Sequence, residues 1–126
     1  MSFVITWNKK GVEVDFFDTV TEEDLSASID AMYHDDRFQD CQYQIVNLEQ
    51  SDLSEISLSH VSKQAATDSN ISSDFPEQFV AIVTESAHTD SLVFYYKLMA
   101  KTHRMHWKFE HFASIDQARA HCNSLP

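Results

Sequence analysis

The segment HRMHWKFEH, residues 103–111, holds the densest group of side chains that could bind a metal ion. A zinc site needs three or four ligands that converge on one point, and imidazole and carboxylate groups are suitable ligands. Side chains alternate between the faces of a strand, which would place Met105, Trp107, Phe109 and His111 on one face and His106, Lys108 and Glu110 on the other. His103 would end the preceding helix. The segment therefore predicts a half-buried edge strand, and we expect no metal site.

A second group of reactive side chains, Glu85, His88 and Asp90, follows the most apolar run of the chain, QFVAIVT at 78–84. Ligands of open α/β sheets bind beyond the carboxyl ends of parallel strands, where this group would lie. His88 with Asp90 or Glu85 could act as the acid–base pair of a small hydrolase or isomerase. Alternatively, Asp90 caps the next helix and His88 is solvated. We favour the second interpretation and expect a protein that is not an enzyme.

The glycine and cysteine contents exclude several classes of enzyme. Gly11 is the only glycine, whereas the common phosphate-binding loops and the nucleophile elbow of serine hydrolases need more than one. Cys41 and Cys122 are isolated and form no disulfide framework. Cys122 and the neighbouring His121 would point apart on a helix. We expect no cofactor.

The charge of the chain restricts its partners. Twenty acidic and 9 basic side chains give a net charge of -11, which repels nucleic-acid phosphates and anionic lipids. The start, MSFVITWNKK, does not resemble a signal peptide, and no apolar run approaches the roughly 18 residues of a membrane span. We expect a cytoplasmic protein that binds no nucleic acid and does not insert into a membrane.

Strand and helix patterns alternate along the chain. Apolar or alternating runs predict strands at 3–7, 12–17, 43–49, 78–84 and 104–112. Helical spacing predicts helices at about 21–33, 53–67, 91–102 and 113–124, and the Ser, Asp and Pro content of 69–77 predicts a loop. Helix caps are expected at Thr21 with Asp24, at Asp90 or Thr89, and at Ser114 with Gln117.

The order of these elements, β-β-α-β-α-β-α-β-α, predicts an α/β fold in one domain over residues 1–126. Strands that alternate with helices form parallel pairs, while the leading hairpin supplies one antiparallel strand. We therefore expect a single mixed, mostly parallel five-stranded sheet with helices. Residues 79–83 would form its central strand, buried on both faces.

The helix expected at 91–102, SLVFYYKLMAKT, is more apolar than packing on a sheet requires. Its apolar positions span an arc of roughly 220° at about 100° per residue, whereas one sheet-facing stripe needs about 100°. Neighbouring helices, a ligand or another chain must bury the excess. The candidate residues for binding a ligand or partner are Leu92, Tyr95, Tyr96 and Met99, with Glu85, His88 and Asp90 in the preceding loop.

With this element order, the chain resembles the SpoIIAA-like (STAS/Sec14-like) branch of the STAS family. The similarity covers nearly the whole chain and depends on the leading hairpin, TVTEEDL, QIVNLE, FVAIVT and WKFEHFASIDQARAHC. The resemblance implies a non-enzymatic domain. It also implies a phosphorylated serine at the head of the helix after the third strand, where Ser54 and Ser57 lie within EQSDLSEISLS. The Asp-Ser-(Ser or Ala)-Gly motif of the anti-sigma-factor antagonists does not occur there.

Together these patterns predict a non-catalytic STAS-like binding or regulatory domain. It would recognise an apolar, lipid-like small molecule or a protein partner through the 85–96 region. A homodimeric module, joined through the helix at 91–102 or an exposed sheet edge, is the structural alternative. The enzyme alternative is the hydrolase or isomerase that uses His88.

Overall fold

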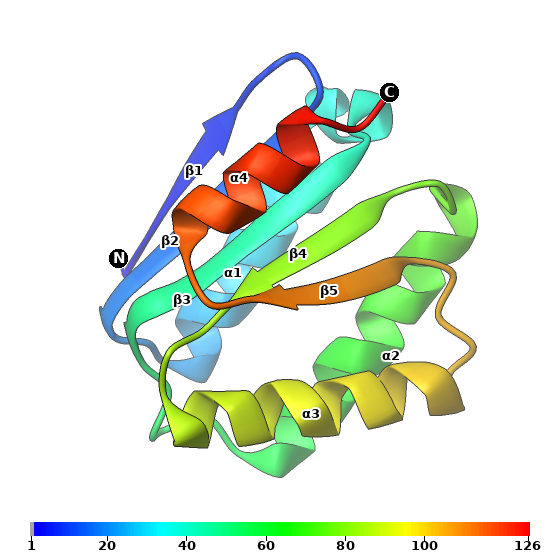
Figure 1. Cartoon of the computed structure of the whole chain (residues 1–126). Helices are drawn as coiled ribbons and strands as arrows, with labels where there is room; N and C mark the ends of the chain where they lie inside the picture. The colour runs from blue at the N-terminus through cyan, green and yellow to red at the C-terminus, as the bar shows by residue number, and fades with distance from the viewer. Residues whose placement is uncertain (1) are drawn as a thin grey trace.

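The structure, a computed structural model, describes residues 2–126 apart from the side chains of Ala87 and His88. Its strands are β1 (Phe3–Trp7), β2 (Gly11–Thr19), β3 (Tyr43–Asp52), β4 (Phe79–Val83) and β5 (Lys108–Phe112), which form one sheet in that order (Figure 1). Its helices are α1 (Glu22–Tyr33), the short 3₁₀ helix η1 (Asp36–Asp40), α2 (Leu58–Asp74), α3 (Ala87–Thr102) and α4 (Ile115–Asn123). β1 is antiparallel to β2, and the other neighbouring pairs are parallel. The predicted α/β fold with a mixed, mostly parallel sheet is confirmed.

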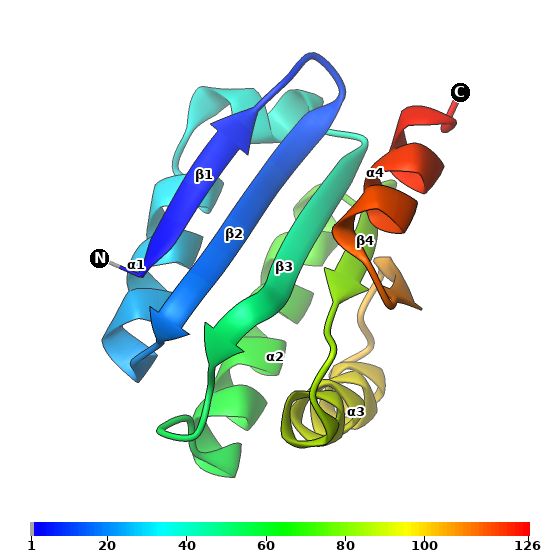
Figure 2. The same cartoon turned by 60° about the vertical axis from the view of Figure 1, so that its left-hand side comes forward.

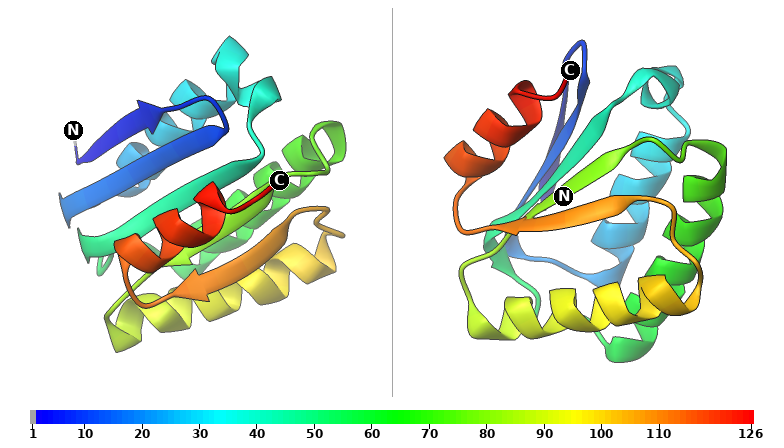
Figure 3. Two further views of the ribbon diagram at one scale, coloured as in Figure 1. Left: turned by 45° about the horizontal axis from the view of Figure 1, so that its top comes forward. Right: turned by 45° about the vertical axis from the view of Figure 1, so that its right-hand side comes forward.

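The helices are divided unequally between the two faces of the sheet. The connections from β2 to β5 all step in one direction along the sheet, so right-handed crossovers place α1, α2 and α3 on one face. α4 follows the edge strand β5 and packs on the opposite face, over β3, β4 and β5 (Figures 2 and 3). None of the described helices covers β1 and β2 on that face, where Val4 is 54% exposed.

Alternation along the strands produces two hydrophobic cores. The larger core lies between the sheet and α1, α2 and α3, and receives Val80 and Ile82 of β4. The smaller core lies under α4 and receives Ala81 and Val83 from the same strand. β4 is thus buried on both faces, which explains its continuous apolar sequence. It is the fourth strand rather than the central one, because the middle position belongs to β3.

The turn between β1 and β2 accounts for the position of Gly11. Asn8 Oδ1 accepts hydrogen bonds from the backbone N–H groups of Lys10 and Gly11, both at 2.9 Å. A Cβ atom on Gly11 would lie 2.6 Å from ring atoms and the carbonyl oxygen of Tyr43, its partner in β3. Glycine is therefore required for β2 and β3 to pair at this end.

Two predicted caps are confirmed and one is wrong. Thr21 and Asp24 form a reciprocal capping box at α1, and Ser114 caps α4. α3 begins at Ala87, before the predicted start, and its cap is Ser86, whose Oγ accepts from the backbone N–H of Thr89 at 3.0 Å. Asp90 is not the cap because it lies inside the first turn of α3.

α2 both begins and ends later than predicted. Leu53 and Ile56 precede the helix and fill the larger core from a loop. At the far end, the hydroxyls of Ser69 and Ser72 donate to the carbonyl oxygens of Ala65 and Ser69, both at 2.7 Å. These bonds are compatible with helical backbone. The loop predicted at 69–77 is therefore wrong for residues 69–74, which are helical.

β5 is shorter than the strand predicted at 104–112. Arg104 has a φ of 60°, which ends α3 and prevents an extended chain at this residue. Residues 108–112 pair with β4 and keep the predicted alternation, with Phe109 towards the larger core. Trp107 precedes the strand but is still buried, and its indole N–H donates to the carbonyl oxygen of Phe75 at 2.8 Å.

Candidate functional site

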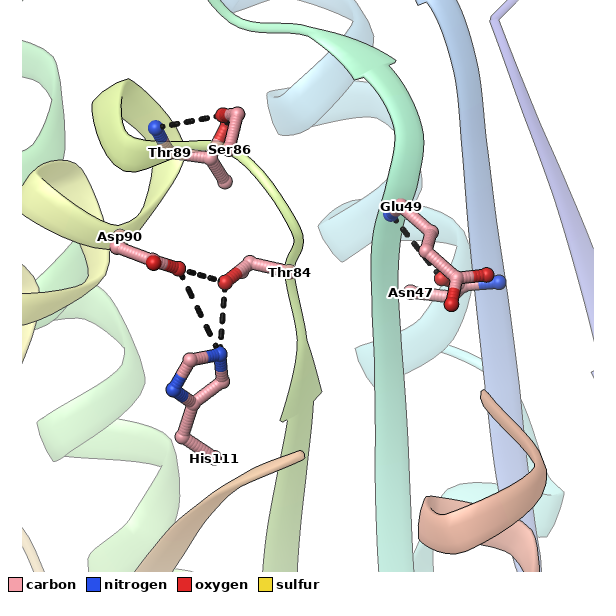
Figure 4. Close-up of polar contacts among 7 residues, drawn as sticks. All are labelled: Asn47, Glu49, Thr84, Ser86, Thr89, Asp90 and His111. Carbon is pink, nitrogen blue, oxygen red and sulfur yellow. Dashed lines mark hydrogen bonds and ion pairs between the residues drawn. The ribbon is translucent and has the colours of Figure 1, made fainter. Parts of the chain in front are cut away.

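The carboxyl ends of β4 and β5 and the first turn of α3 bring Thr84, Asp90 and His111 together (Figure 4). Thr84 Oγ1 donates a hydrogen bond to Asp90 Oδ1 and lies 2.7 Å from His111 Nε2. His111 Nε2 is 3.5 Å from Asp90 Oδ1. Thr84 is buried, whereas Asp90 and His111 are exposed.

The hydrogen-bond directions in this cluster do not activate a nucleophile. The single hydroxyl proton of Thr84 is donated to Asp90, and the same oxygen contacts His111 Nε2. A general base would have to accept the hydroxyl proton at the imidazole instead. The cluster therefore serves to join β4, α3 and β5 at this edge of the sheet.

Of the three residues predicted as a site, Asp90 belongs to this cluster. Asp90 is engaged by Thr84, and Glu85 is exposed at the end of β4. His88 belongs to the first turn of α3, and its side chain lies outside the described residues. The pairing of His88 with Asp90 or Glu85 therefore stays a prediction.

Ser54 and Ser57 lie in and after the turn that leads into α2. Ser57 is the N-cap of the helix, and its Oγ accepts from the backbone N–H of His60 at 3.1 Å. The same hydroxyl donates to Glu22 Oε2 at 2.8 Å. Ser54 is exposed, and its backbone N–H donates to Asp52 Oδ1. Phosphorylation of either serine stays a prediction, and a phosphate on Ser57 would face the Glu22 carboxylate.

A cavity of about 150 Å³ lies inside the larger core, between the sheet and α1, α2 and α3. Most of its wall is apolar. The apolar lining includes Val46, Ile82, Ile29, Val61, Leu92 and Trp107. Of the residues predicted on α3, Leu92 and Tyr96 line this cavity, whereas Tyr95 and Met99 do not. The structure thus separates the predicted group into cavity residues and residues elsewhere on α3 and its loop.

Val46 marks the place where the larger core is not filled. It lies in β3, the middle strand, and its side chain faces the three helices. It is nevertheless only partly buried, while its neighbours Ile45 and Ile82 are 2% and 5% exposed. A residue at this position is expected to be among the most buried of the fold. Its remaining accessible surface therefore faces the cavity.

Asp68 of α2 supplies the charged part of the cavity wall. Its Oδ1 accepts from Tyr33 Oη at 2.5 Å and from Gln64 Nε2 at 2.7 Å, and its Oδ2 accepts from Tyr96 Oη. Burial raises the pKa of Asp68 to about 6, although the three hydrogen bonds oppose this by favouring the ionised carboxylate. Since Tyr33 ends α1 and Tyr96 lies on α3, one carboxylate joins three helices.

The polar residues of the cavity were not predicted from the sequence. His60, Gln64 and Asp68 are spaced by four residues and form one stripe along α2. The predicted helix ended at Thr67, which left Asp68 outside it. A predicted helix that continued through the serine-rich segment would have placed Asp68 on the same face as His60 and Gln64. Tyr33 had no sequence signal, because only the fold brings the end of α1 to α2.

Comparison of the chain with protein-family models, with curated proteins and with solved structures finds no match. Within residues 2–126 as described, no group of three or more His, Cys, Asp or Glu side chains could hold a metal ion. In the same part of the chain, no helix has the length and apolar character needed to cross a bilayer.

Proposed function

We propose that the chain is a non-catalytic, STAS-like binding domain that takes up a compact apolar molecule between the sheet and α1, α2 and α3. The observation that carries this proposal is the cavity of about 150 Å³ in the larger core. Natural cores have few voids larger than a water molecule, and an unfilled one is destabilising. A ligand that fills the void would restore the lost packing.

The size and polarity of the cavity indicate the kind of ligand. In another protein, an engineered apolar cavity of about this volume remains dry and binds benzene or xenon. Here the wall is similarly apolar, with polar side chains confined mainly to α1 and α2. The cavity therefore suits a molecule of the size of one small ring. A long-chain lipid would require further opening of the helices.

Titration of the protein with benzene tests this proposal. Trp107 lines the cavity and is buried, so its fluorescence should change as benzene binds and then saturate. In Val46→Phe the larger ring should occupy the cavity and abolish benzene binding. Val4→Phe is the matched control, since Val4 is exposed on the other face of the sheet and this change should leave binding intact. Saturable binding that survives Val46→Phe would refute the proposed location.

A homodimer is a second candidate function, and it is favoured by an apolar groove beside α3 and β5. The groove is lined by Phe94, Leu98, Lys97, Lys101 and Met105, among others. Phe94 is 62% exposed and Leu98 is 46% exposed, so the described helices do not bury the excess apolar arc of α3. The segment 91–109 has four of the nine basic residues and no acidic residue. The acidic surface of a second copy would complement it.

Sedimentation velocity tests the dimer. We expect self-association at low salt that weakens as salt is added, because charge complementarity is screened. Phe94→Ser and Leu98→Ser should each reduce it. Val4→Ser removes an exposed apolar side chain from β1 and should have no effect. A monomer under all of these conditions would eliminate this second candidate.

A further inference from the structure

Gln44 presents an unpaired carbonyl oxygen to the cavity. It lies in β3, is 2% exposed and lines the cavity. Its Nε2 donates to Gln78 Oε1 at 2.7 Å, whereas its Oε1 accepts no hydrogen bond from the described residues. This oxygen keeps some accessible surface, because His60 Nε2 is the only unpaired side-chain nitrogen or oxygen of the described residues that is fully enclosed. Since Gln44 is otherwise buried, the accessible side of its Oε1 faces the cavity.

A chain of hydrogen bonds fixes the orientation of the Gln44 amide. The backbone carbonyl oxygen of Phe38 can only accept, so the Gln78 atom that lies 3.1 Å from it is Nε2. Gln78 then presents its Oε1 to Gln44, and Gln44 must donate from Nε2. Gln78 is 3% exposed and does not line the cavity. The Gln44 amide is therefore left with an acceptor, Oε1, and with one spare N–H donor.

The hydroxyl groups of the cavity wall are already paired. Those of Tyr33 and Tyr96 donate to Asp68, and that of Ser28 donates to a backbone carbonyl oxygen of α1 at 2.7 Å. Asp68 accepts a third hydrogen bond from Gln64 Nε2 at 2.7 Å. These groups need no ligand to satisfy their hydrogen bonds.

Two further side chains of the wall keep unpaired groups. Gln64 has a spare N–H and a free Oε1, but it is only partly buried, so water can pair with both. His60 Nε2 has no partner, yet it is fully enclosed and a molecule in the cavity cannot contact it. A buried polar group without a partner is costly. Among the described residues, Gln44 therefore has the strongest requirement for a polar group of the ligand.

We propose that the ligand is a compact neutral ring with adjacent N–H and C=O groups, as in a lactam, and that it pairs with the side-chain amide of Gln44. This inference rests on the proposed function, because it assigns the polar contact of the same cavity. The ligand N–H donates to Gln44 Oε1, and the ligand carbonyl oxygen accepts the spare N–H of Nε2. A ring with only an acceptor would leave Oε1 unpaired. A charged ring would lose far more on desolvation than one neutral amide returns.

Four rings of similar size test the two hydrogen bonds separately by NMR titration. Benzene has neither group, pyridine has only an acceptor, pyrrole has only a donor, and 2-pyridone has both. One net hydrogen bond contributes up to about 1.4 kcal/mol, which is about tenfold in affinity. In Gln44→Met, which removes the amide, the affinities of pyrrole and 2-pyridone relative to benzene should fall about tenfold or more, and that of pyridine should change least. The control Gln50→Met replaces an exposed glutamine of the same strand and should keep all the wild-type ratios.

The ¹³C resonance of the Gln44 side-chain carbonyl gives a test that needs no variant, since Gln44→Met also leaves Gln78 Oε1 without its donor. Pyrrole and 2-pyridone should shift this resonance to lower field, as a hydrogen bond to a carbonyl does, and benzene should not. Benzene binding without this shift and without a preference that depends on Gln44 would mean that water alone pairs with Oε1. That result would overturn the inference but leave the proposed function standing. Tighter binding of pyridine than of pyrrole would overturn the donor assignment. If none of the four rings binds, the proposed function itself is overturned.

Discussion

Asp68 is the ionisable residue whose protonation most affects the packing around the cavity. Its carboxylate is buried among α1, α2 and α3, and its partners Tyr33, Tyr96 and Gln64 are neutral. Burial of the charged form costs free energy, which is the reason that burial raises the pKa of Asp68. Folding is therefore coupled to uptake of a proton at this residue.

We predict that Asp68→Asn removes part of the pH dependence of the free energy of unfolding. The folded protein holds the Asp68 proton up to a pKa of about 6, against 3.8 for the ordinary value. Stability from this group is therefore full below pH about 4 and is lost as the pH rises through about 6. The loss is on the order of 3 kcal/mol, at 1.36 kcal/mol per pKa unit. Urea unfolding of wild type and of Asp68→Asn between these pH values would measure this loss as the difference between their free energies of unfolding.

Asp15 is the control for this experiment. Desolvation raises its pKa to about 6 as well, but it lies on the other face of the sheet, beside Glu13 and Arg119. In Asp15→Asn the contribution of Asp68 to the pH dependence of the free energy of unfolding should be unchanged, because the two carboxylates do not share a partner. Identical pH profiles for wild type and Asp68→Asn would contradict the assignment.

Tyr96→Phe should destabilise the protein much more than Tyr95→Phe. The Tyr96 hydroxyl donates to the buried Asp68 carboxylate, and removal of one donor from a charged group costs about 1.5–3 kcal/mol. Tyr95 is the adjacent residue on the same helix but does not line the cavity. Chemical unfolding at pH 7 would measure both changes. Equal effects of the two substitutions would show that the Asp68 bond contributes little.

At the scale of the elements, the sequence predicted the strands better than the helix ends. Apolar runs identified all five strands, because burial between helices leaves a continuous pattern such as FVAIV at 79–83. Helix ends depend on local hydrogen bonds that composition does not reveal. Ser69, Ser72 and Ser73 looked like a loop, yet their hydroxyls donate to backbone carbonyls within α2.

The cap of α2 gives a prediction at this scale. Ser57→Ala removes the acceptor for the His60 N–H and the donor to Glu22, and should destabilise the protein by about 1 kcal/mol. Ser54→Ala, three residues earlier in the exposed turn, should be nearly neutral. Thermal unfolding of the two variants would distinguish the residues. A larger loss from Ser54→Ala would show that the turn, and not the cap, holds α2.

The candidate site was less predictable than the elements, because it depends on contacts between them. The apolar arc of α3 includes Leu92 and Tyr96, which line the cavity, but their binding of a ligand stays a prediction. Asp68 could not be found in this way, because its partners Tyr33 and Tyr96 are distant in sequence. Only the packing of three helices on one face makes them neighbours.

At the scale of the molecule, the topology explains why the cavity lies on one side. The strand order β1-β2-β3-β4-β5 sends every crossover helix to the same face. Three helices must then cover the sheet and also meet one another, and the Asp68 hydrogen bonds fix where they meet. The opposite face has the short helix α4, which packs directly on Ala81 and Val83 through Ala118 and Cys122. Small residues allow this close approach.

The net charge of -11 gives the last prediction. Charges of one sign repel one another across the folded surface, and salt screens them as the Debye length falls from about 30 Å at 0.01 M to about 3 Å at 1 M. The melting temperature at pH 7 should therefore rise with sodium chloride over this range. Salt weakens the surface pair Arg37–Asp35, which contributes little, and it screens Arg119–Glu13 less because the Glu13 side chain is only 12% exposed. Near pH 4.8, the isoelectric point of the sequence, the salt effect should nearly vanish. A melting temperature that falls with salt at pH 7 would mean that specific ion pairs outweigh the overall repulsion.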